Sequence, residues 1–351
     1  MSPRPRQRAA RAAAAVAALL FPLRAGADPC DGALSTTDTD PVHGAAAIDL
    51  CTPSDGSSEG LVEAAYGNSD FSSPLSSLTN GLLGVGLLAS FGPNVVPQVG
   101  ARMLALSSGT ARAPSDSGYV APGQGFSKQF SSPAPPGFPA PIGACDPASG
   151  TVWDSAALRV TLVAPTWANS YRFDFKFYTT DYPNYVCTAY NDQFLVLASA
   201  PPVGSLNGDI ALDAALDPIT VNSSDFLTEC GPGGSYSCPL GAAELAGTGF
   251  EGGAATPWLR TTAPIGGGDT LTLTFLIFDS SDGTYDATAL IDAFAWSPAS
   301  VAGPSTQLAP EPAGAQAAAL ALFLLVSAER RRRARPADSL QPFPSKEIRT
   351  P

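Results

Sequence analysis

The chain has 351 residues, with 19 Lys and Arg against 31 Asp and Glu, and a formal net charge of −12 at pH 7. The stretch from Asp28 to Pro312 is more acidic still, because it holds seven basic and 28 acidic residues, a balance of about −21. Such a charge repels nucleic acid and anionic membrane surfaces, and it favours solubility and the binding of divalent cations. A nucleic-acid partner is therefore excluded.

The first 27 residues have the composition of a secretory signal peptide. Four arginines precede an apolar run from Ala12 to Leu23, and Ala25-Gly26-Ala27 forms a small-residue cleavage motif. The apolar run of about 12 residues is shorter than the roughly 20 that span a bilayer. We therefore expect an exported protein whose mature chain begins at Asp28.

A second targeting pattern lies near the C-terminus, where an Ala/Leu run occupies residues 313–328 and a tail continues over 334–351. The flanking residues are Pro310, Glu311 and Pro312 before the run and Arg330, Arg331, Arg332 and Arg333 after it. Arginines that follow an apolar run indicate a cytoplasmic end. The arrangement resembles the PEP-CTERM sorting signal of Gram-negative bacteria. That resemblance implies the export machinery and a sorting protease or transpeptidase as partners, with transient or permanent membrane anchoring.

All six cysteines lie in the part expected to be exported, and an even number in an oxidising compartment indicates disulfides. They are Cys30, Cys51, Cys145, Cys187, Cys230 and Cys238. Six cysteines permit 15 pairings. The short, glycine-rich spacing between Cys230 and Cys238 suggests a local bridge. Cys30 with Cys51 and Cys145 with Cys187 would then remain. A zinc site is the alternative, but the sequence has no CxxC pair.

Alternation of large apolar and polar residues predicts strands through the second half of the chain. The clearest is at 171–177, where Tyr171, Phe173, Phe175 and Phe177 would form one buried face. An aromatic loop and a strand at 194–198 follow it. The other expected strands are 158–163, 270–278 and 289–296, with weaker candidates at 82–91, 102–107, 209–212 and 218–221.

The composition favours an all-β fold. Gly and Pro each number 34, and the Pro/Gly/Ser-rich segment 113–143 excludes both helix and central strand. We predict a jelly-roll-like β-sandwich with long loops, flanked by N- and C-terminal hydrophobic targeting helices. The expected organisation is a signal peptide (1–27), a disulfide-tied polar lead-in (28–60), the sandwich (61–297), a linker (298–312), the sorting segment with its arginines (313–333) and the tail (334–351).

Several stretches of the expected sandwich resemble the choice-of-anchor L domain of bacterial exported proteins, in a cysteine-framed variant similar to myxobacterial members. They are LSSGTA at 106–111, YTTDYPNYVCTAYNDQF at 178–194, ITVN at 219–222 and the segment from Gly247 to Trp296. Together they cover most of residues 61–297. The resemblance implies display at the cell surface and implies no particular reaction.

No catalytic motif of the GxSxG, HExxH or P-loop type occurs in the sequence. His43 is the only histidine, and its place in a polar loop indicates a surface residue rather than a member of a catalytic triad. We therefore expect no enzymatic activity and no required cofactor. A glycoside hydrolase, which needs only two carboxylates, stays open as a third possibility.

Calcium is the sharpest ligand hypothesis. Asp279, Asp282 and Asp286 fall within one predicted turn, and carboxylate oxygens are the ligands that calcium prefers. An Asp-capped hairpin turn explains the same three residues, and the spacing is not that of an EF-hand. Asn191 and Asp192 form a second candidate, with a cap before the next strand as the alternative. Asp292, predicted to share a strand face with Phe294, needs a turn amide or a cation as its partner.

The aromatic residues offer one further binding hypothesis. Tyr182, Tyr185 and Tyr190, with Trp258 elsewhere, could stack on sugar rings, although such residues more often pack in cores or loops. The sequence therefore predicts an exported cell-surface or extracellular-matrix protein with a structural or adhesive role. The alternative is a calcium-dependent carbohydrate-binding module, with exopolysaccharide or other surface proteins as partners.

Overall fold

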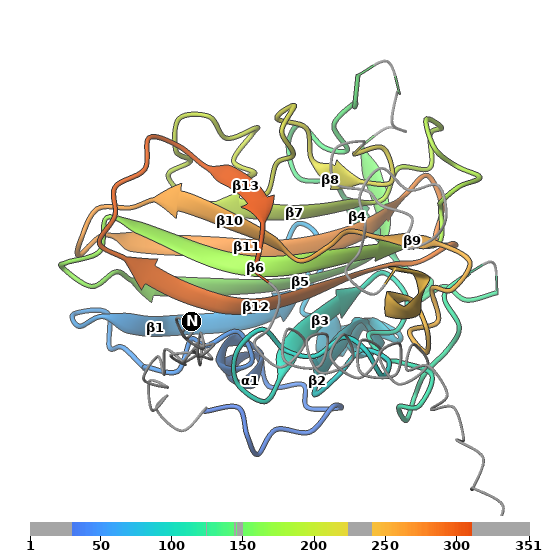
Figure 1. The fold of residues 1–351 in the computed structure, drawn as a ribbon, viewed down its shortest axis with the longest axis horizontal. Coiled ribbons are helices and arrows are strands. Elements are labelled where there is room, and N and C mark those ends of the chain that lie inside the picture. Colours follow the sequence, from blue (N-terminus) through green and yellow to red (C-terminus); the bar gives the residue numbers. More distant parts are fainter. Residues whose placement is uncertain (1–29, 124, 144, 146–149, 224–240, 311–351) are drawn as a thin grey trace, which may run out of the picture.

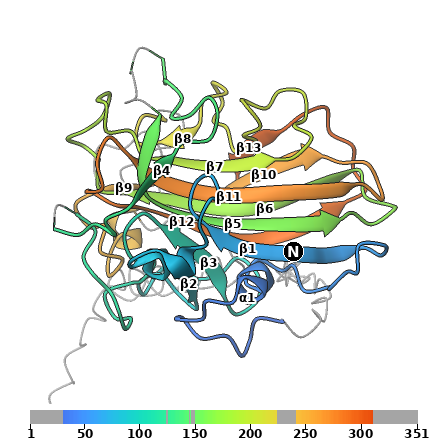
Figure 2. The same cartoon turned by 180° about the vertical axis from the view of Figure 1, so that it is seen from behind.

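The computed structural model describes residues 30–123, 125–143, 145, 150–223 and 241–310. Within them, two antiparallel sheets stack face to face (Figures 1 and 2), and the helix α1 (Pro41–Ala46) packs beside β1. The predicted targeting helices and the Cys230 to Cys238 pair lie outside the described residues. No helix in the described part of the chain is long and apolar enough to cross a membrane.

The first sheet has the strand order β1-β5-β11-β7-β8, and β4 pairs with the outer part of β5. Figure 2 shows this sheet in front. The bounds of its strands are β1 (Gly60–Gly67), β4 (Ser131–Pro133), β5 (Thr151–Val163), β7 (Gln193–Ala198), β8 (Ile219–Thr220) and β11 (Thr270–Ser280).

The second sheet has the order β13-β10-β6-β12-β3-β2, and β9 pairs with the end of β6. Its strands are β2 (Val85–Leu88), β3 (Met103–Ser107), β6 (Ser170–Thr179), β9 (Ala254–Ala255), β10 (Leu259–Pro264), β12 (Ala287–Ser297) and β13 (Ser305–Leu308). Three short 3-10 helices complete the described elements: η1 (Leu75–Ser77), η2 (Gly81–Gly84) and η3 (Gly241–Glu244).

The main core lies between the sheets and is built by the inward rows of the long strands. Phe275 and Ile277 of β11 face Phe173 and Phe175 of β6, and the Phe173 and Phe275 rings meet edge to face at 5.2 Å. Two smaller apolar clusters cover the outer faces, around Tyr178 and Trp258 on one sheet and around Leu276 and Phe278 on the other. The outside of each sheet is therefore partly covered, and exposed strand residues are found mainly on β1, β4 and β13.

The long strands predicted from alternation are confirmed, with three corrections. Residues 82–91 contain η2 before the short β2, because Gly81 and Gly84 tighten the turn. Residues 209–212 form isolated bridges rather than a strand. Polar residues on β6 are buried as well, so the prediction of a single buried face was wrong.

The buried polar residues of β6 are paired. Arg260, directly opposite on β10, donates from Nε and an Nη to both oxygens of Asp174, at 2.6 and 2.7 Å. Lys176 forms a buried ion pair with Glu244 of η3. Each charge is matched, which is the condition under which buried charges are tolerated.

The two disulfides predicted by elimination are confirmed. Cys30 pairs with Cys51 within the lead-in, and Cys145 pairs with Cys187 and ties the end of the Pro-rich segment to the aromatic loop. His43 is half exposed and contacts Asp38, as expected for a surface residue.

Candidate functional site

At one end of the sandwich, the inward apolar rows of neighbouring strands terminate in aspartates. On β11 the row Phe275, Ile277 continues to Asp279, which lies inside the strand rather than in the turn predicted for it. Asp192 precedes the inward-facing Phe194 of β7, and Asp181 follows β6. Because side chains alternate along a strand, this spacing points the first two carboxylates into the gap between the sheets.

A β-bulge brings a fourth carboxylate to the same end. The register between β11 and β5 shifts between Ile277 and Asp279, and Asp154 in β5 adopts a positive φ of 48°. Bulges commonly redirect a side chain in this way. Asp154 accepts hydrogen bonds from Ser127 Oγ at 2.6 Å, from the Lys128 amide at 2.7 Å and from the Phe130 amide at 3.2 Å. Both carboxylate oxygens of Asp154 therefore accept hydrogen bonds, and these bonds hold loop 127–130 in place.

Asp286, immediately before β12, is the fifth aspartate, and Lys128 is a cation beside it. The Lys128 side chain is fully buried, and its Nζ donates to the Ser107 carbonyl at 2.7 Å. Both side chains depend on glycine neighbours. A Cβ at Gly84 would lie 2.5 Å from Lys128 Nζ, and a Cβ at Gly109 would lie 2.2 Å from Asp286 Oδ2. We call Asp154, Asp181, Asp192, Asp279, Asp286 and Lys128 the aspartate cluster.

Burial dominates the electrostatics of the aspartate cluster. Desolvation, then the charge of Asp282, raises the pKa of Asp181 to about 8. Desolvation raises the pKa of Asp286 to about 7, although Lys128 opposes the shift. For Asp192 and Asp279, burial and the neighbouring carboxylates raise the pKa well above its usual range. The pKa of Lys128 is lowered to about 8, chiefly by desolvation. At neutral pH the cluster therefore needs protons or a bound cation.

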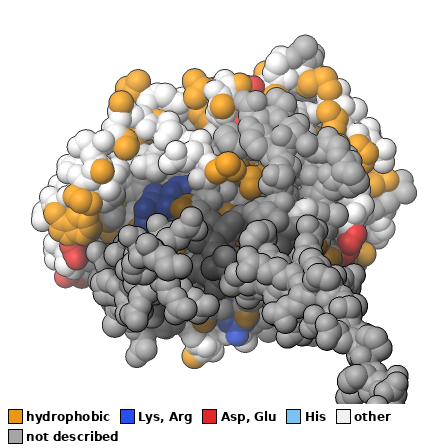
Figure 3. Space-filling model, in the orientation of Figure 1, with side chains coloured by type: hydrophobic (Ala, Val, Ile, Leu, Met, Phe, Trp, Pro, Cys, Tyr) orange, Lys and Arg blue, Asp and Glu red, His pale blue; other side chains and the backbone are white. Residues whose placement is uncertain are grey.

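Several carboxylate oxygens of the cluster have no hydrogen-bond partner among the described residues. These are both oxygens of Asp279, both oxygens of Asp286, and Oδ2 of Asp181 and of Asp192. All four side chains are at most 2% exposed. The described part of the chain holds no set of three His, Cys, Asp or Glu side chains already arranged as a metal-binding group. Few Asp or Glu side chains appear on the described surface in Figure 3, in line with this burial.

The structure brings together three of the four residues proposed as calcium ligands and leaves the fourth apart. Asp192, Asp279 and Asp286 are brought together in the aspartate cluster. Asp282 is half-buried in the β11 to β12 turn, where its Oδ1 accepts from the amide and hydroxyl of Thr284 at 3.2 and 3.0 Å. Asp282 therefore makes the turn cap that was the alternative interpretation, while its charge still acts on Asp181.

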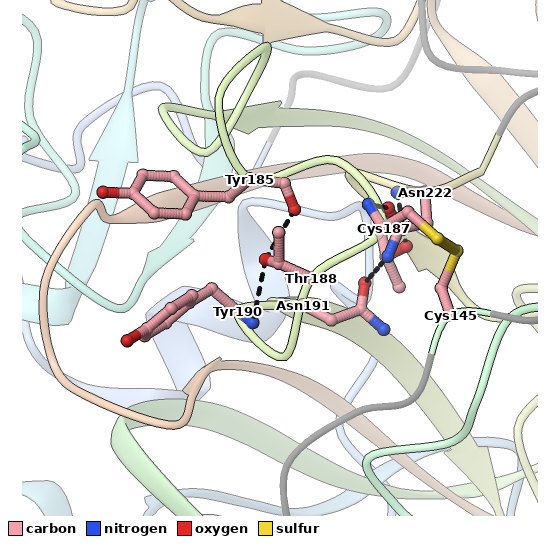
Figure 4. The surroundings of a disulfide bond; sticks show 8 residues. Cys145, Tyr185, Cys187, Thr188, Tyr190, Asn191 and Asn222 are labelled. Carbon is pink, nitrogen blue, oxygen red and sulfur yellow. Dashed lines mark hydrogen bonds between the residues drawn. A yellow bond between two sulfur atoms is a disulfide. The ribbon is translucent and has the colours of Figure 1, made fainter.

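The other half of the calcium hypothesis, Asn191 and Asp192, also has capping contacts. Asp192 Oδ1 accepts from the Ser280 amide at 2.9 Å, which joins the start of β7 to the end of β11. Asn191 Oδ1 accepts from Asn222 Nδ2 at 2.8 Å, and Asn222 Oδ1 in turn accepts from the Cys187 amide (Figure 4). The aromatic loop is thereby fixed beside the cluster by one disulfide and one amide bridge.

Of the three tyrosines in this loop, Tyr182 is partly buried and packs against the main core, whereas Tyr185 and Tyr190 lie farther out. Figure 4 shows the rings of Tyr185 and Tyr190 side by side and directed away from the Cys145 to Cys187 disulfide, and their centroids are 5.2 Å apart. Tyr285 joins them from the β11 to β12 turn, 4.9 Å from Tyr185. Tyr190 is 38% exposed, but Trp258 is only 2% exposed and packs in an outer core cluster. Trp258 was therefore wrongly included among the candidate sugar contacts.

The glycoside hydrolase possibility gains no support from a groove at the end of the sandwich opposite the aspartate cluster. This groove, of about 410 Å³, lies between the ends of β6, β7, β10 and β11. Its lining includes Asp269 as a carboxylate, whereas a hydrolase places two carboxyl groups across the substrate. Tyr171 and Leu271 supply its apolar floor.

Sequence reasoning missed Asp154, Asp181 and Lys128. The signal for Asp181 was its spacing of two from Thr179, which continues the inward row of β6. Asp154 had no such signal, because a bulge decides its direction. Lys128 lies in a Pro/Gly/Ser-rich segment that carries no strand periodicity, so its burial follows only from the tertiary fold.

No family model matches this sequence, and no curated protein is detectably similar to it. The resemblance to the choice-of-anchor L domain and the PEP-CTERM-like signal therefore stay predictions. The site has to be interpreted from its own geometry.

Proposed function

We propose that this protein is an exported β-sandwich, of jelly-roll type, that serves a structural or adhesive role at the cell surface. The observation that carries the proposal is the pair of disulfides. Cys30 to Cys51 closes a loop within the lead-in, and Cys145 to Cys187 joins the segment before β5 to the loop between β6 and β7. Disulfides persist in oxidising compartments and are rare in the cytosol. In this proposal the signal peptide directs export, and the C-terminal sorting segment attaches the protein to the membrane or cell surface.

The composition supports the same role. A net negative charge, −12 for the whole chain, helps to keep a displayed protein soluble and apart from other anionic surfaces. Loops cover much of the outside of the two sheets, and the edge strands β1 and β13 and the loops at the ends of the sandwich have exposed residues that are available for contact. The proposal includes no catalytic step.

The test is the location of the full chain in a Gram-negative host that has a PEP-CTERM sorting system. We expect an externally added protease or an impermeant biotin reagent to reach it on intact cells, with its cysteines oxidised. A variant with Pro310→Ala and Glu311→Ala should remain in the membrane fraction unprocessed. Retention in the cytoplasm with reduced cysteines would contradict the proposal.

A carbohydrate-binding role is a second candidate, favoured by the tyrosine pair beside the aspartate cluster. Tyr190 is exposed and packs against the half-buried Tyr185 on a loop that one disulfide fastens. Aromatic rings of this kind can stack on sugars. The expected result is retention on exopolysaccharide that Tyr190→Ala weakens and chelation reduces. Trp167→Ala is the control, because Trp167 is 53% exposed and lies in the turn between β5 and β6.

A further inference from the structure

The aspartate cluster divides into two unequal halves. In one half, Asp154 is satisfied by three donors, and Asp286 lies within the field of the Lys128 ammonium. In the other half are Asp181, Asp192 and Asp279, which come from the ends of three different strands. The Lys128 charge acts on Asp154, Asp279 and Asp286, while the pKa values of Asp181 and Asp192 are raised by burial and by neighbouring carboxylates.

The second half holds buried carboxylate oxygens without a hydrogen-bond partner among the described residues, and its members interact through Asp192, whose pKa is raised by burial and then by both Asp181 and Asp279. Asp192 Oδ1 is used by the Ser280 amide, but its Oδ2 has no partner among the described residues. The same holds for Asp181 Oδ2 and for both oxygens of Asp279. An ionised carboxylate that is buried without a donor is costly, and three together multiply the cost. Such an arrangement is stable only when positive charge enters it.

We propose that Asp181, Asp192 and Asp279 bind a divalent cation, calcium, at the end of the sandwich core. The unpartnered oxygens of the three carboxylates supply the protein ligands, and water completes the shell. Calcium suits this site because it takes six to eight oxygen ligands in flexible geometry, whereas Mg²⁺ demands a near-ideal octahedron and zinc prefers nitrogen and sulfur. The three side chains are not already arranged as a metal-binding group, so binding rotates them towards the ion.

The position of the site gives the ion a mechanical role. Asp181 begins the aromatic loop, Asp192 ends it, and Asp279 precedes the turn that carries Tyr285. An ion held by all three would fasten the loop of Tyr185 and Tyr190 to the β11 to β12 turn. This inference does not depend on where the protein resides, so it can hold or fail independently of the surface-display proposal.

The first experiment titrates CaCl2 into the full-length, disulfide-intact chain after chelator treatment, at pH 7 and fixed ionic strength. A ligand that binds only the native state raises its stability by mass action. We expect a saturable rise in Tm of about 4 °C or more, and a much smaller rise with MgCl2 at equal concentration. Terbium provides a second readout, because the adjacent tyrosines should sensitise its emission and calcium should quench it by competition.

Matched variants separate binding from general stability. Asp192→Asn and Asp279→Asn keep the side-chain shape and remove charge, so both should fold and both should weaken terbium and calcium binding at least about tenfold. Asp209→Asn is the control. Asp209 is equally buried and also has an unpartnered Oδ2, but it lies elsewhere, where it accepts from the amides of Val196 and Ala211.

The outcomes are decisive. A calcium-dependent Tm that survives in Asp209→Asn and is lost in both cluster variants supports the site. Two results would overturn it. One is no change in Tm and no terbium emission at millimolar ion, which would leave protons as the counter-charge. The other is an equal loss of binding in Asp209→Asn, which would show a nonspecific effect of the acidic chain.

Discussion

The loops before and after β3 each lie against buried carboxylates from other segments, but only the loop before β3 donates its backbone amides to them. Before β3, Asp31 Oδ2 accepts from the amides of Ala101 and Arg102 at 2.8 and 2.6 Å, and Asp292 Oδ2 accepts from the amides of Gln98 and Val99 at 2.6 and 3.3 Å. After β3, Asp286 lies against Gly109, and Asp286 and Asp279 each keep both carboxylate oxygens without a partner in the described structure.

The difference teaches how a fold can distinguish structural from ligand-binding carboxylates. A loop that wraps its amides around a carboxylate provides the compensation itself, as the predicted turn-amide partner of Asp292 illustrates. Strands that end in carboxylates provide fewer donors, because most of their amides are engaged in the ladder. Several unpartnered carboxylates in one place therefore call for protons or a bound cation, whereas a carboxylate surrounded by loop amides fastens that loop.

The largest expected change in the free energy of unfolding comes from Asp292, whose carboxylate accepts hydrogen bonds from the loop before β3. Asp292→Ala would leave the Gln98 and Val99 amides without their acceptor, and we expect a loss of about 3 kcal/mol in the free energy of unfolding. Urea denaturation with and without calcium measures it. The loss should be the same in both conditions. A loss that appears only with calcium would mean that Asp292 belongs to a cation site.

Asp279→Asn should have the opposite sign when calcium is absent. Removing one of several mutually repelling buried charges should raise the free energy of unfolding by about 1 to 2 kcal/mol in EDTA at pH 8. In saturating calcium the same variant should be less stable than the unmodified protein. If Asp279→Asn is destabilising in both conditions, its carboxylate has a donor partner and the contrast between the two loops fails.

Packing around the cluster offers a steric test. Gly109→Ala would place a Cβ 2.2 Å from Asp286 Oδ2, so the neighbouring backbone or side chain must shift. We expect a loss of about 1 to 2 kcal/mol, in the range of overpacking substitutions. Gly252→Ala, which meets nothing within 4 Å, serves as the control and should change stability by less than about 0.5 kcal/mol.

Asp209 gives the pH dependence of a buried carboxyl without charged neighbours. Burial raises its pKa from 3.8 to about 8. Between these values the native protein keeps a proton that the unfolded chain has lost, so Asp209's contribution to stability falls as pH rises from about 4 to about 8. The slope is at most about 1.4 kcal/mol per pH unit. Asp209→Asn should remove this part of the slope, which denaturation across pH 5 to 8 would reveal. An unchanged slope would contradict the assignment.

The fold was largely predictable, because long strands such as β6 and β11 carry their inward rows in plain alternation. Two disulfides followed from spacing, since the glycine-rich stretch at Cys230 leaves few alternatives. The cluster was only partly predictable. Asp279 and Asp192 were singled out as oxygen ligands, but Asp279 was placed in a turn because the alternation of β11 was stopped at Phe278. Asp154 and Lys128 depend on a bulge and on a loop without periodicity, which local sequence does not encode.

The most direct test of the central claim is the calcium content of the full-length protein, measured by mass spectrometry after dialysis against buffered calcium at pH 7. The account predicts about one tightly held ion per chain, retained in Asp209→Asn and absent from the Asp192→Asn, Asp279→Asn double variant. The same calcium content in the double variant, or none in the unmodified protein, would contradict it.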